Sequence, residues 1–127
     1  MSRLVPILFV ALASALGACG VDADTRPHTA TYIQQAILEP SCGRETCHST
    51  ALKIAGFAFD TRDGFLEASA ELVYTGTVPV GETKAGRSKL HQVLVGEKDP
   101  QMPPDGPLTA DDIDLIAAWI DDGAQAN

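Results

Sequence analysis

The residues of this chain best able to do chemistry lie in one short segment, Cys42-Gly43-Arg44-Glu45-Thr46-Cys47-His48. Two cysteines with a histidine directly after the second are what covalent haem attachment requires. The two thiols add across the vinyl groups of the porphyrin, and the adjacent imidazole is directed at the iron. The common motif is Cys-x-x-Cys-His, whereas this chain has four residues between its cysteines. Because the separation of the vinyl groups is fixed, the additional residues would have to bulge away from the ring.

A second axial ligand for such an iron is usually a methionine sulfur in electron-transfer proteins. Apart from the initiator Met1, the chain contains one methionine, Met102, in the segment Asp99-Pro100-Gln101-Met102-Pro103-Pro104. Prolines on both sides stiffen this loop, so that holding the thioether in place costs little conformational entropy. A methionine in a proline-rich loop is poorly explained by core packing, because methionine otherwise fills gaps in cores. His48 and Met102 are therefore the candidate iron ligands, and Cys42 and Cys47 the candidate attachment sites.

Other interpretations of these residues remain open at this stage. Cys42 and Cys47 could form a structural disulfide, which the oxidising exterior of a cell favours. The same two thiols with His48 could bind zinc if His91 or His28 supplied a fourth ligand. His91 lies on an expected helix and is more simply a packed or partly exposed side chain. A haem sensor, or a subunit of a redox enzyme with a labile Met102, is a further alternative.

The N-terminus has the features of an export signal. A short basic start is followed by an apolar run from Leu4 to Leu16, which is shorter than the roughly 20 residues of a spanning helix. The sequence Leu16-Gly17-Ala18-Cys19 resembles a bacterial lipobox, which implies cleavage before Cys19 and acylation of its sulfur. Two or three acyl chains would anchor the protein firmly. We expect residues 1–18 to be a lipoprotein signal peptide and residues 19–30 a lipidated N-terminus and tether; an ordinary cleavage nearby would leave Cys19 as a free thiol.

Length and charge limit the remaining possibilities. The 127 residues suffice for one domain, and 9 basic against 17 acidic residues give a net charge of −8, which argues against nucleic-acid binding. Removal of residues 1–18 takes away Arg3, so the mature chain of 109 residues would carry −9. Residues 97–122 alone hold eight acids and one base. This acidity serves solubility and helix capping, or else docking to a basic partner.

The pattern of apolar residues predicts helices over 31–38, 61–72 and 87–95, with Pro40 stopping the first. A last helix should begin at the N-cap Thr109, with a carboxylate three residues on, and end at Gly123. Trp119 on this helix is expected to pack, with Tyr32 on the first helix as one partner. Prolines should keep 96–107 as an extended loop. Three to five helices and no clear strand predict a small all-α domain over residues 31–124.

From about Tyr32 to Gly123, some 90 of the 109 mature residues, the sequence resembles the small class I-like c-type cytochrome domains of bacterial lipoproteins and planctomycete-type cytochrome proteins. The resemblance is carried by the following motifs in order: an apolar helix and a proline before the cysteines, Gly56-Phe57-Ala58-Phe59, Pro79-Val80-Gly81, Ser88-Lys89-Leu90, Met102-Pro103-Pro104, and a final helix through Trp119-Ile120 to Asp121-Asp122-Gly123-Ala124. It implies a helical fold wrapped around one haem c, thioethers at Cys42 and Cys47, iron ligation by His48 and Met102, and electron transfer as the activity. A proline that often follows the histidine is absent, so the hydrogen-bond partner of His48 is unidentified.

The sequence as a whole therefore predicts a monohaem c-type cytochrome. It would act as an electron carrier rather than an enzyme, since no nucleophile motif or acid–base pair argues for catalysis. Its expected location is outside the cytoplasm, on the periplasmic side or the cell surface, with a lipid on Cys19 in the membrane and a redox protein as partner. The alternative is a haem-free lipoprotein with a Cys42–Cys47 disulfide that serves as a binding or assembly module.

Overall fold

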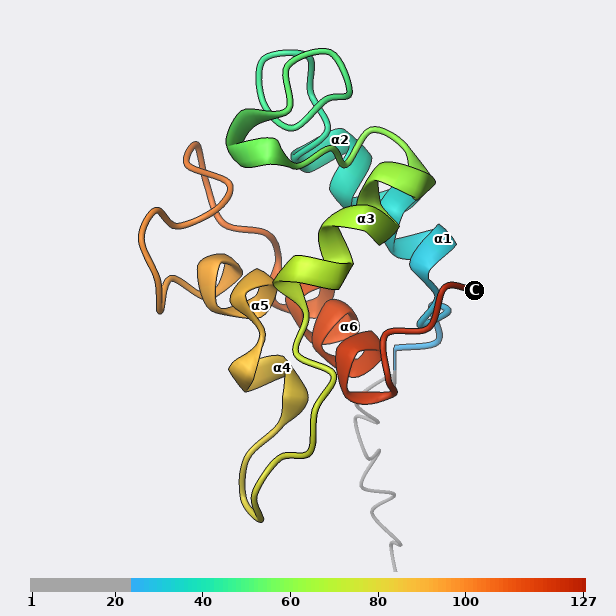
Figure 1. Ribbon diagram of the computed structural model, residues 1–127, viewed down its shortest axis with the longest axis vertical. Coiled ribbons are helices and arrows are strands. Elements are labelled where there is room, and N and C mark those ends of the chain that lie inside the picture. The colour runs from blue at the N-terminus through green and yellow to red at the C-terminus, as the bar shows by residue number, and fades with distance from the viewer. Residues whose placement is uncertain (1–23) are drawn as a thin grey trace, which may run out of the picture.

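The computed structural model describes residues 24–127, and every regular element in them is helical. The expected export signal and Cys19 lie outside the described residues. The all-α prediction is confirmed for the described part of the chain, where no strand occurs. Within it, no helix is both long and apolar enough to cross a bilayer. The elements are α1 (Ala30–Ile33), η1 (Gln34–Leu38), α2 (Glu39–Ser41), η2 (Ile54–Gly56), α3 (Arg62–Leu72), α4 (Lys84–Arg87), α5 (Lys89–Leu94) and α6 (Ala110–Asp121) (Figure 1).

The first three elements run on without interruption and end at the first cysteine. The hydroxyl of Thr29 caps α1 by accepting a hydrogen bond from the amide of Tyr32. The middle segment, η1, is a π-helix, and Pro40 is accommodated in the last turn, α2. Helix α2 therefore ends at Ser41, beyond the predicted limit at residue 38. Its C-cap residue is Cys42, whose amide donates to the carbonyl of Leu38 at 2.7 Å.

Helix α3 begins one residue after the predicted start at Thr61, which is its N-cap, and α6 begins directly after its predicted N-cap, Thr109. The Thr61 hydroxyl accepts from the amide of Gly64, and the Thr109 hydroxyl accepts from the amide of Asp112. Each side chain satisfies an amide that has no partner within its helix. Helix α6 ends before Gly123, which has a φ of +106°, a left-handed conformation that glycine adopts without strain. These two helices are set by local sequence.

The helix predicted over 87–95 is confirmed by α5 over residues 89–94, but it begins later than predicted, because Ser88 separates α5 from a second short helix, α4. Ser88 is almost fully buried and has extended backbone angles. Its hydroxyl donates to the carbonyl of Lys84 and accepts from the amide of Tyr74, both at 2.8 Å. A serine that bonds the backbone in this way competes with the regular helical ladder, and here a tertiary contact with Tyr74 decides the outcome.

The core forms around α6, which Figure 1 shows behind α3. Trp119 and Phe65 are buried with ring centroids 5.2 Å apart, so the aromatic partner of Trp119 is Phe65 of α3 rather than the expected Tyr32. The indole N–H of Trp119 donates to the carbonyl of Gln125 at 3.0 Å, which satisfies the polar atom of the ring. This core holds the two long loops that form the site described below.

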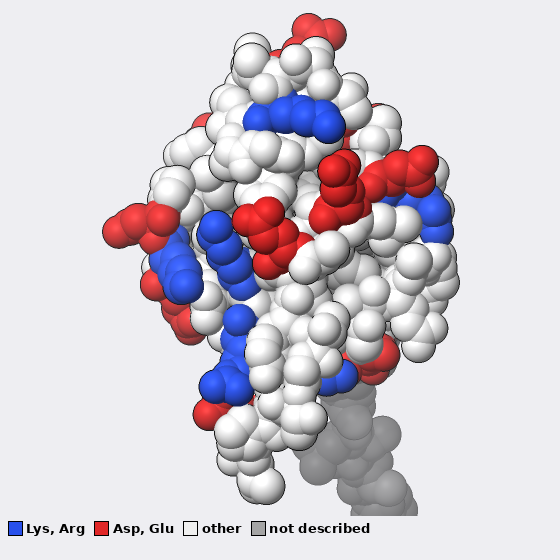
Figure 2. All heavy atoms as spheres, in the orientation of Figure 1, with Lys and Arg blue, Asp and Glu red and all other residues white. Residues whose placement is uncertain are grey.

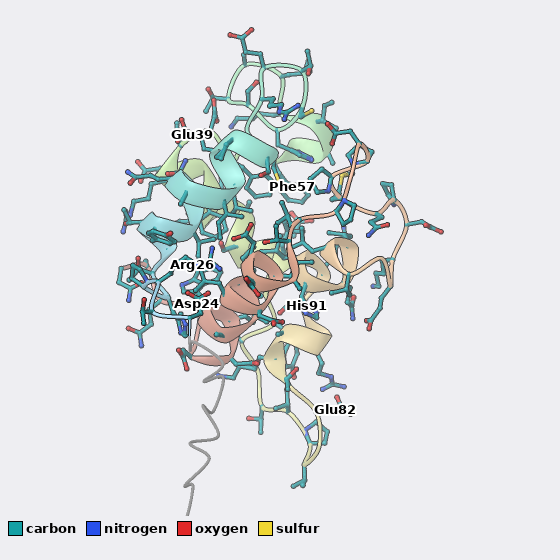
Figure 3. The ribbon with its side chains drawn as sticks, turned by 180° about the vertical axis from the view of Figure 1, so that it is seen from behind. Asp24, Arg26, Glu39, Phe57, Glu82 and His91 are labelled. Atoms are coloured by element: carbon teal, nitrogen blue, oxygen red, sulfur yellow. The ribbon has the colours of Figure 1, made fainter. Side chains whose placement is uncertain are left out.

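Both ends of the described chain are held against this core, beyond the predicted limits of 31–124. Arg26 pairs with Asp24 and with Asp112 of α6, and Figure 3 shows Asp24 and Arg26 together beside that helix. The carbonyl of Asn127 accepts from the amide of Thr31 at 3.0 Å. The N-terminal turn of α1 is thus joined to the last residues of the chain.

Candidate functional site

A cavity of about 600 Å³ is lined by residues of the loop that follows α2 and of the loop that joins α5 to α6. Figure 1 shows where these two loops lie in the fold. This volume is within the range of roughly 300–1,000 Å³ typical of sites for cofactors and small molecules. Apolar side chains make up most of its lining, with contributions from η1, α3 and α5. All four side chains that the sequence singles out line this one cavity: Cys42, Cys47, His48 and Met102. The structure therefore brings together residues from two loops that are 54 positions apart in the chain.

The loop between α2 and η2, residues 42–53, is called the cysteine loop and is closed by backbone hydrogen bonds. The amide of Cys47 donates to the carbonyl of Arg44 at 2.9 Å, and the amide of His48 donates to the carbonyl of Cys42 at 3.0 Å. Gly43 permits the tight turn, because a Cβ at this position would lie 2.9 Å from the backbone of Asp60. The four residues between the cysteines thus form a compact turn that leaves both thiols on the cavity wall.

Both thiols are free in the structure, and they differ in environment. Cys42 is 9% exposed, and Cys47 is half-buried. Burial raises the pKa of the Cys42 thiol to about 11, with the nearby Cys47 and Asp105 contributing to the rise. The thiolate is the reactive form in oxidation and disulfide exchange. Cys42 therefore stays protonated and unreactive near neutral pH, which preserves it as a thiol.

His48 is oriented by a hydrogen bond that sequence reasoning missed. Its Nδ1 lies 2.8 Å from the carbonyl oxygen of Ile54. A carbonyl can only accept, so Nδ1 carries the proton and Nε2 keeps its lone pair for a ligand or metal. The ring of Phe59 packs edge-on against the imidazole at a centroid distance of 5.2 Å. His48 thus has the tautomer and the support expected of a metal-ligating histidine.

A strained turn brings the Ile54 carbonyl to this position. Lys53 and Ala55, on either side of Ile54, have φ values of +46° and +55°, and Gly56 follows at +87°. A left-handed conformation costs roughly 1–2 kcal/mol for a residue with a Cβ. Gly56 was the one signal of an unusual backbone in this segment. Strain of this kind is typical of sites where the surroundings fix a functional geometry.

Met102 lines the cavity from the loop between α5 and α6, residues 95–109, which is called the methionine loop. Its amide donates to the carbonyl of Val93 at 2.9 Å, which ties the loop to the end of α5. The side chain is half-buried and lines the cavity with Pro103 and Pro104. The predicted loop is confirmed in that no helix or strand occurs between α5 and α6, but it consists largely of turns and bends rather than extended chain. Proline limits the backbone freedom of this loop and so holds the thioether near one place.

These donors match the chemistry of a c-type haem site. Two thiols, an imidazole with a free Nε2 and a thioether sulfur are the groups that would attach the macrocycle and ligate its iron. The wall around them includes Phe57 and Phe59, whose rings stack at 6.5 Å. Figure 3 shows Phe57 between the ribbons of the two loops. The residues present therefore fit the group.

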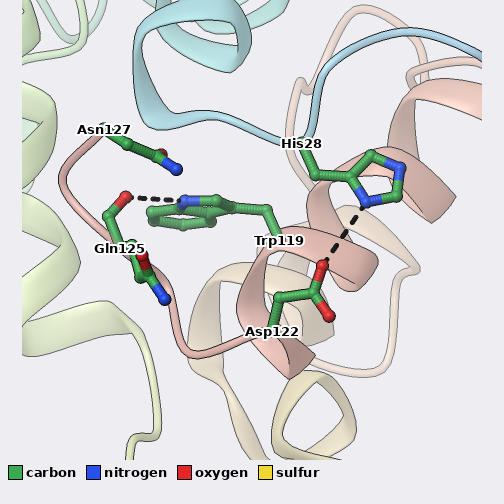
Figure 4. Close-up of a pocket in the computed structure, with 5 residues that line it drawn as sticks. All are labelled: His28, Trp119, Asp122, Gln125 and Asn127. Carbon is green, nitrogen blue, oxygen red and sulfur yellow. Dashed lines mark hydrogen bonds and ion pairs between the residues drawn. The ribbon is translucent and has the colours of Figure 1, made fainter.

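The other two histidines in the described chain do not line this cavity. His91 lies on α5, where its buried Nδ1 has no hydrogen-bond partner. His28 borders a separate hollow of about 190 Å³ with Trp119 and Asp122, 3.5 Å from the Asp122 carboxylate (Figure 4). Among residues 24–127 no group of three His, Cys, Asp or Glu side chains is placed to hold a metal ion. Neither histidine that the sequence offered as a fourth zinc ligand lines the cavity with Cys42 and Cys47.

The acids of residues 97–122 do not form a single patch. Asp112 pairs with Arg26, and Asp122 lies beside His28. Asp121 accepts from an amide at the start of α4 at 2.9 Å, which stabilises the positive end of that helix. On the face in Figure 2, acidic and basic side chains are interspersed. Much of this acidity therefore serves helix capping and ion pairing within the fold.

The lining of the cavity carries charges of both signs. Asp99 and Asp105 come from the methionine loop, and Arg44 and Lys89 from the cysteine loop and α5. Arg87, which precedes Ser88 at the end of α4, does not line the cavity. It pairs instead with Glu82 at 3.0 Å. Of the two basic residues near the start of α5, Lys89 is the one available to a ligand in the cavity.

Comparison with protein-family models, with curated proteins and with solved structures found no match to this chain.

Proposed function

We propose that this chain is a monohaem c-type cytochrome that transfers electrons outside the cytoplasm and is held at a membrane by a lipid on Cys19. One observation carries the proposal: Cys42, Cys47, His48 and Met102 share one largely apolar cavity although the first three come from a different loop than the fourth. The helical fold would then be a cytochrome c-like domain wrapped around one haem. When bound, haem supplies reversible one-electron chemistry.

Each of these residues has a distinct task in the proposal. Cys42 and Cys47 hold the macrocycle through thioethers, so the cofactor cannot dissociate. His48 offers Nε2 to the iron, because the Ile54 carbonyl keeps the proton on Nδ1 at 2.8 Å. Met102 would offer its sulfur from the other loop, and a methionine ligand raises the reduction potential. With His48 and Met102 both holding the iron, the chain would act as a carrier rather than an enzyme.

The apolar wall supports the same task. Phe59, Leu90 and Leu94 are buried and line the cavity. A dry, low-dielectric surrounding limits solvent access to the iron and thereby tunes its potential. The strained turn at Ile54 also lines the cavity, and the hydrogen bond that its carbonyl accepts from His48 restrains rotation of the imidazole.

The proposed partner is a redox protein with a basic docking surface. After removal of residues 1–18 the chain would carry a net charge of −9, and this overall excess of acid favours a basic partner although the cavity lining itself holds two acids and two bases. Redox encounters of this kind are small, weak and electrostatically steered. We expect the bimolecular rate of electron transfer to fall as the salt concentration rises in stopped-flow measurements; a rate independent of salt would contradict steering by these charges.

Covalent attachment tests the proposal most cheaply. The chain is expressed in a bacterium that attaches haem to exported proteins, and the denatured protein is stained for haem on a gel. We expect colour in the wild type, loss of colour in the Cys42→Ala/Cys47→Ala double variant, and unchanged colour in Cys19→Ala. A pyridine haemochrome spectrum then identifies the type of haem.

Two results would overturn it. One is a wild-type protein that takes up no haem, and the other is haem that acid acetone extracts completely. The first would favour the haem-free alternative, in which Cys42 and Cys47 form a disulfide and the chain serves as a binding or assembly module, and the second would show that haem is bound without thioethers.

A further inference from the structure

An ion pair joins the two loops across the cavity. Nη1 of Arg44, in the cysteine loop, lies 3.5 Å from Oδ2 of Asp105, in the methionine loop. Both side chains line the cavity. We propose that this pair, the Arg44–Asp105 bridge, positions the loop that carries Met102. The inference rests on the proposed function, because the sulfur of Met102 gains a role there as an iron ligand.

The position of Arg44 follows from the unusual spacing of the cysteines. Gly43 packs against the backbone of Asp60 so closely that no side chain fits there. The residues of the turn that follow Gly43, including Arg44, are exposed to solvent. Nε of Arg44 donates to the carbonyl of Pro40 at 3.2 Å, which fixes one side of the guanidinium and leaves the other for Asp105. The four-residue turn thus has a structural use, as the support of a cation beside the methionine loop.

The methionine loop needs such a contact on the far side of Met102. On the near side, the amide of Met102 is bonded to the carbonyl of Val93. Pro103 and Pro104, which come directly after, have no amide hydrogen to donate. The next backbone bond, from Gly106 to the carbonyl of Pro103, stays within the loop. Asp105 is therefore the point where this half of the loop is linked to the cysteine side.

The bridge is exposed, which limits its effect. The two side chains are 60% and 68% exposed. Ion pairs this exposed change an equilibrium constant by about five-fold at most. We expect its loss to increase the opening of the loop, and hence the exchange of Met102 for an external ligand, by about two- to five-fold. Salt screens exposed charges, so the difference between wild type and variant should shrink at high ionic strength.

Three variants and a control isolate the bridge. Asp105→Asn removes one charge, Arg44→Asp places like charges together, and the Arg44→Asp/Asp105→Arg double variant restores an opposite pair. Glu82→Gln is the matched control, because Glu82 forms a comparably exposed pair with Arg87. Figure 3 shows Glu82 near the lower end of the molecule, well away from Phe57 of the cavity.

Two measurements on the full chain, as purified, provide the readout. The first is hydrogen exchange of the amides between residues 99 and 106, which requires no haem. The second is the rate at which added imidazole displaces the sulfur ligand, followed in the visible spectrum. We expect both to rise about two- to five-fold in Asp105→Asn, more in Arg44→Asp, and to return toward wild type in the double variant. Glu82→Gln should change neither.

The outcomes separate this inference from the proposed function. Hydrogen-exchange rates in Asp105→Asn equal to those of wild type would overturn the proposed role of the bridge, and so would rates that do not recover in the double variant. Either result would do so even if haem is bound. A further outcome is a wild type that takes up no haem, with hydrogen exchange that is faster in Asp105→Asn and recovers in the double variant. The hydrogen exchange would then support the bridge as a contact that holds the loop, and the missing haem would refute the role of Met102 as an iron ligand. Faster hydrogen exchange with unchanged imidazole rates would show that the bridge does not act on the sulfur.

Discussion

The titration of Cys42 provides a quantitative test of how the site is buried. Burial raises the pKa of this thiol to about 11 from an ordinary value of 9.0. Between these two pH values the unfolded chain loses the proton and the folded chain keeps it. Ionisation therefore favours the unfolded state, so the stability linked to this thiol is fully present below pH 9 and is lost as the pH rises toward 11.

The size of the loss follows from the shift. A rise of about two pKa units corresponds to roughly 2–3 kcal/mol, at about 1.4 kcal/mol per unit. Cys42 is only 9% exposed, so solvent screens little of this penalty. The loss would be a substantial part of the roughly 5–15 kcal/mol that stabilises a typical domain.

Urea unfolding of the reduced, haem-free chain measures this loss. The free energy of unfolding is determined at about pH 8 and pH 11, for the wild type and for Cys42→Ala. Other groups that titrate in this window are common to both proteins and cancel in the difference. We expect the wild type to lose roughly 2–3 kcal/mol more than the variant over this interval. Equal losses would refute the burial of the thiol, and a disulfide formed without reductant should abolish the difference.

Three further substitutions test the geometry of the site. Gly43→Ala should lower the free energy of unfolding by about 1–3 kcal/mol, since its Cβ would lie 2.9 Å from the backbone of Asp60. The control Gly86→Ala, within α4, should change it by no more than about 1 kcal/mol, and equal effects in urea unfolding would contradict the tight turn. Ala55→Gly, at a φ of +55°, should stabilise the chain by up to about 1 kcal/mol, whereas destabilisation would argue against strain there. Met102→Ala should retain covalent haem but open the iron to small ligands, and an unchanged visible spectrum would exclude Met102 as a ligand.

The helices with strong local signals were predictable from the sequence. Thr61 and Thr109 cap α3 and α6 through their own hydroxyls, and such caps depend on neighbours a few residues away. The resemblance marked Ser88-Lys89-Leu90 as a helix start, but the separate helix α4 before it was not predicted, and the bond that holds Ser88 comes from the amide of Tyr74, fourteen residues away in the chain. Local patterns carry no information about such a contact.

The same distinction applies to the site. The side chains of cysteine, histidine and methionine can bind metals or cofactors wherever they lie in a fold. Cys42, His48 and Met102 could therefore be selected from the sequence alone. The partner of His48 could not, because it is a backbone carbonyl, at Ile54, and every residue has one. Its position depends on left-handed angles at residues such as Ala55, which residue type disfavours and tertiary packing imposes.

Mass spectrometry of the purified chain tests the central claim most directly. After denaturation and proteolysis, the peptide that contains both Cys42 and Cys47 is isolated and fragmented. The account predicts that this peptide carries one haem, bonded to both sulfurs, in spite of the four residues between them. A peptide with free thiols or a Cys42–Cys47 disulfide and no haem, from cells that attach haem to other exported proteins, would contradict it.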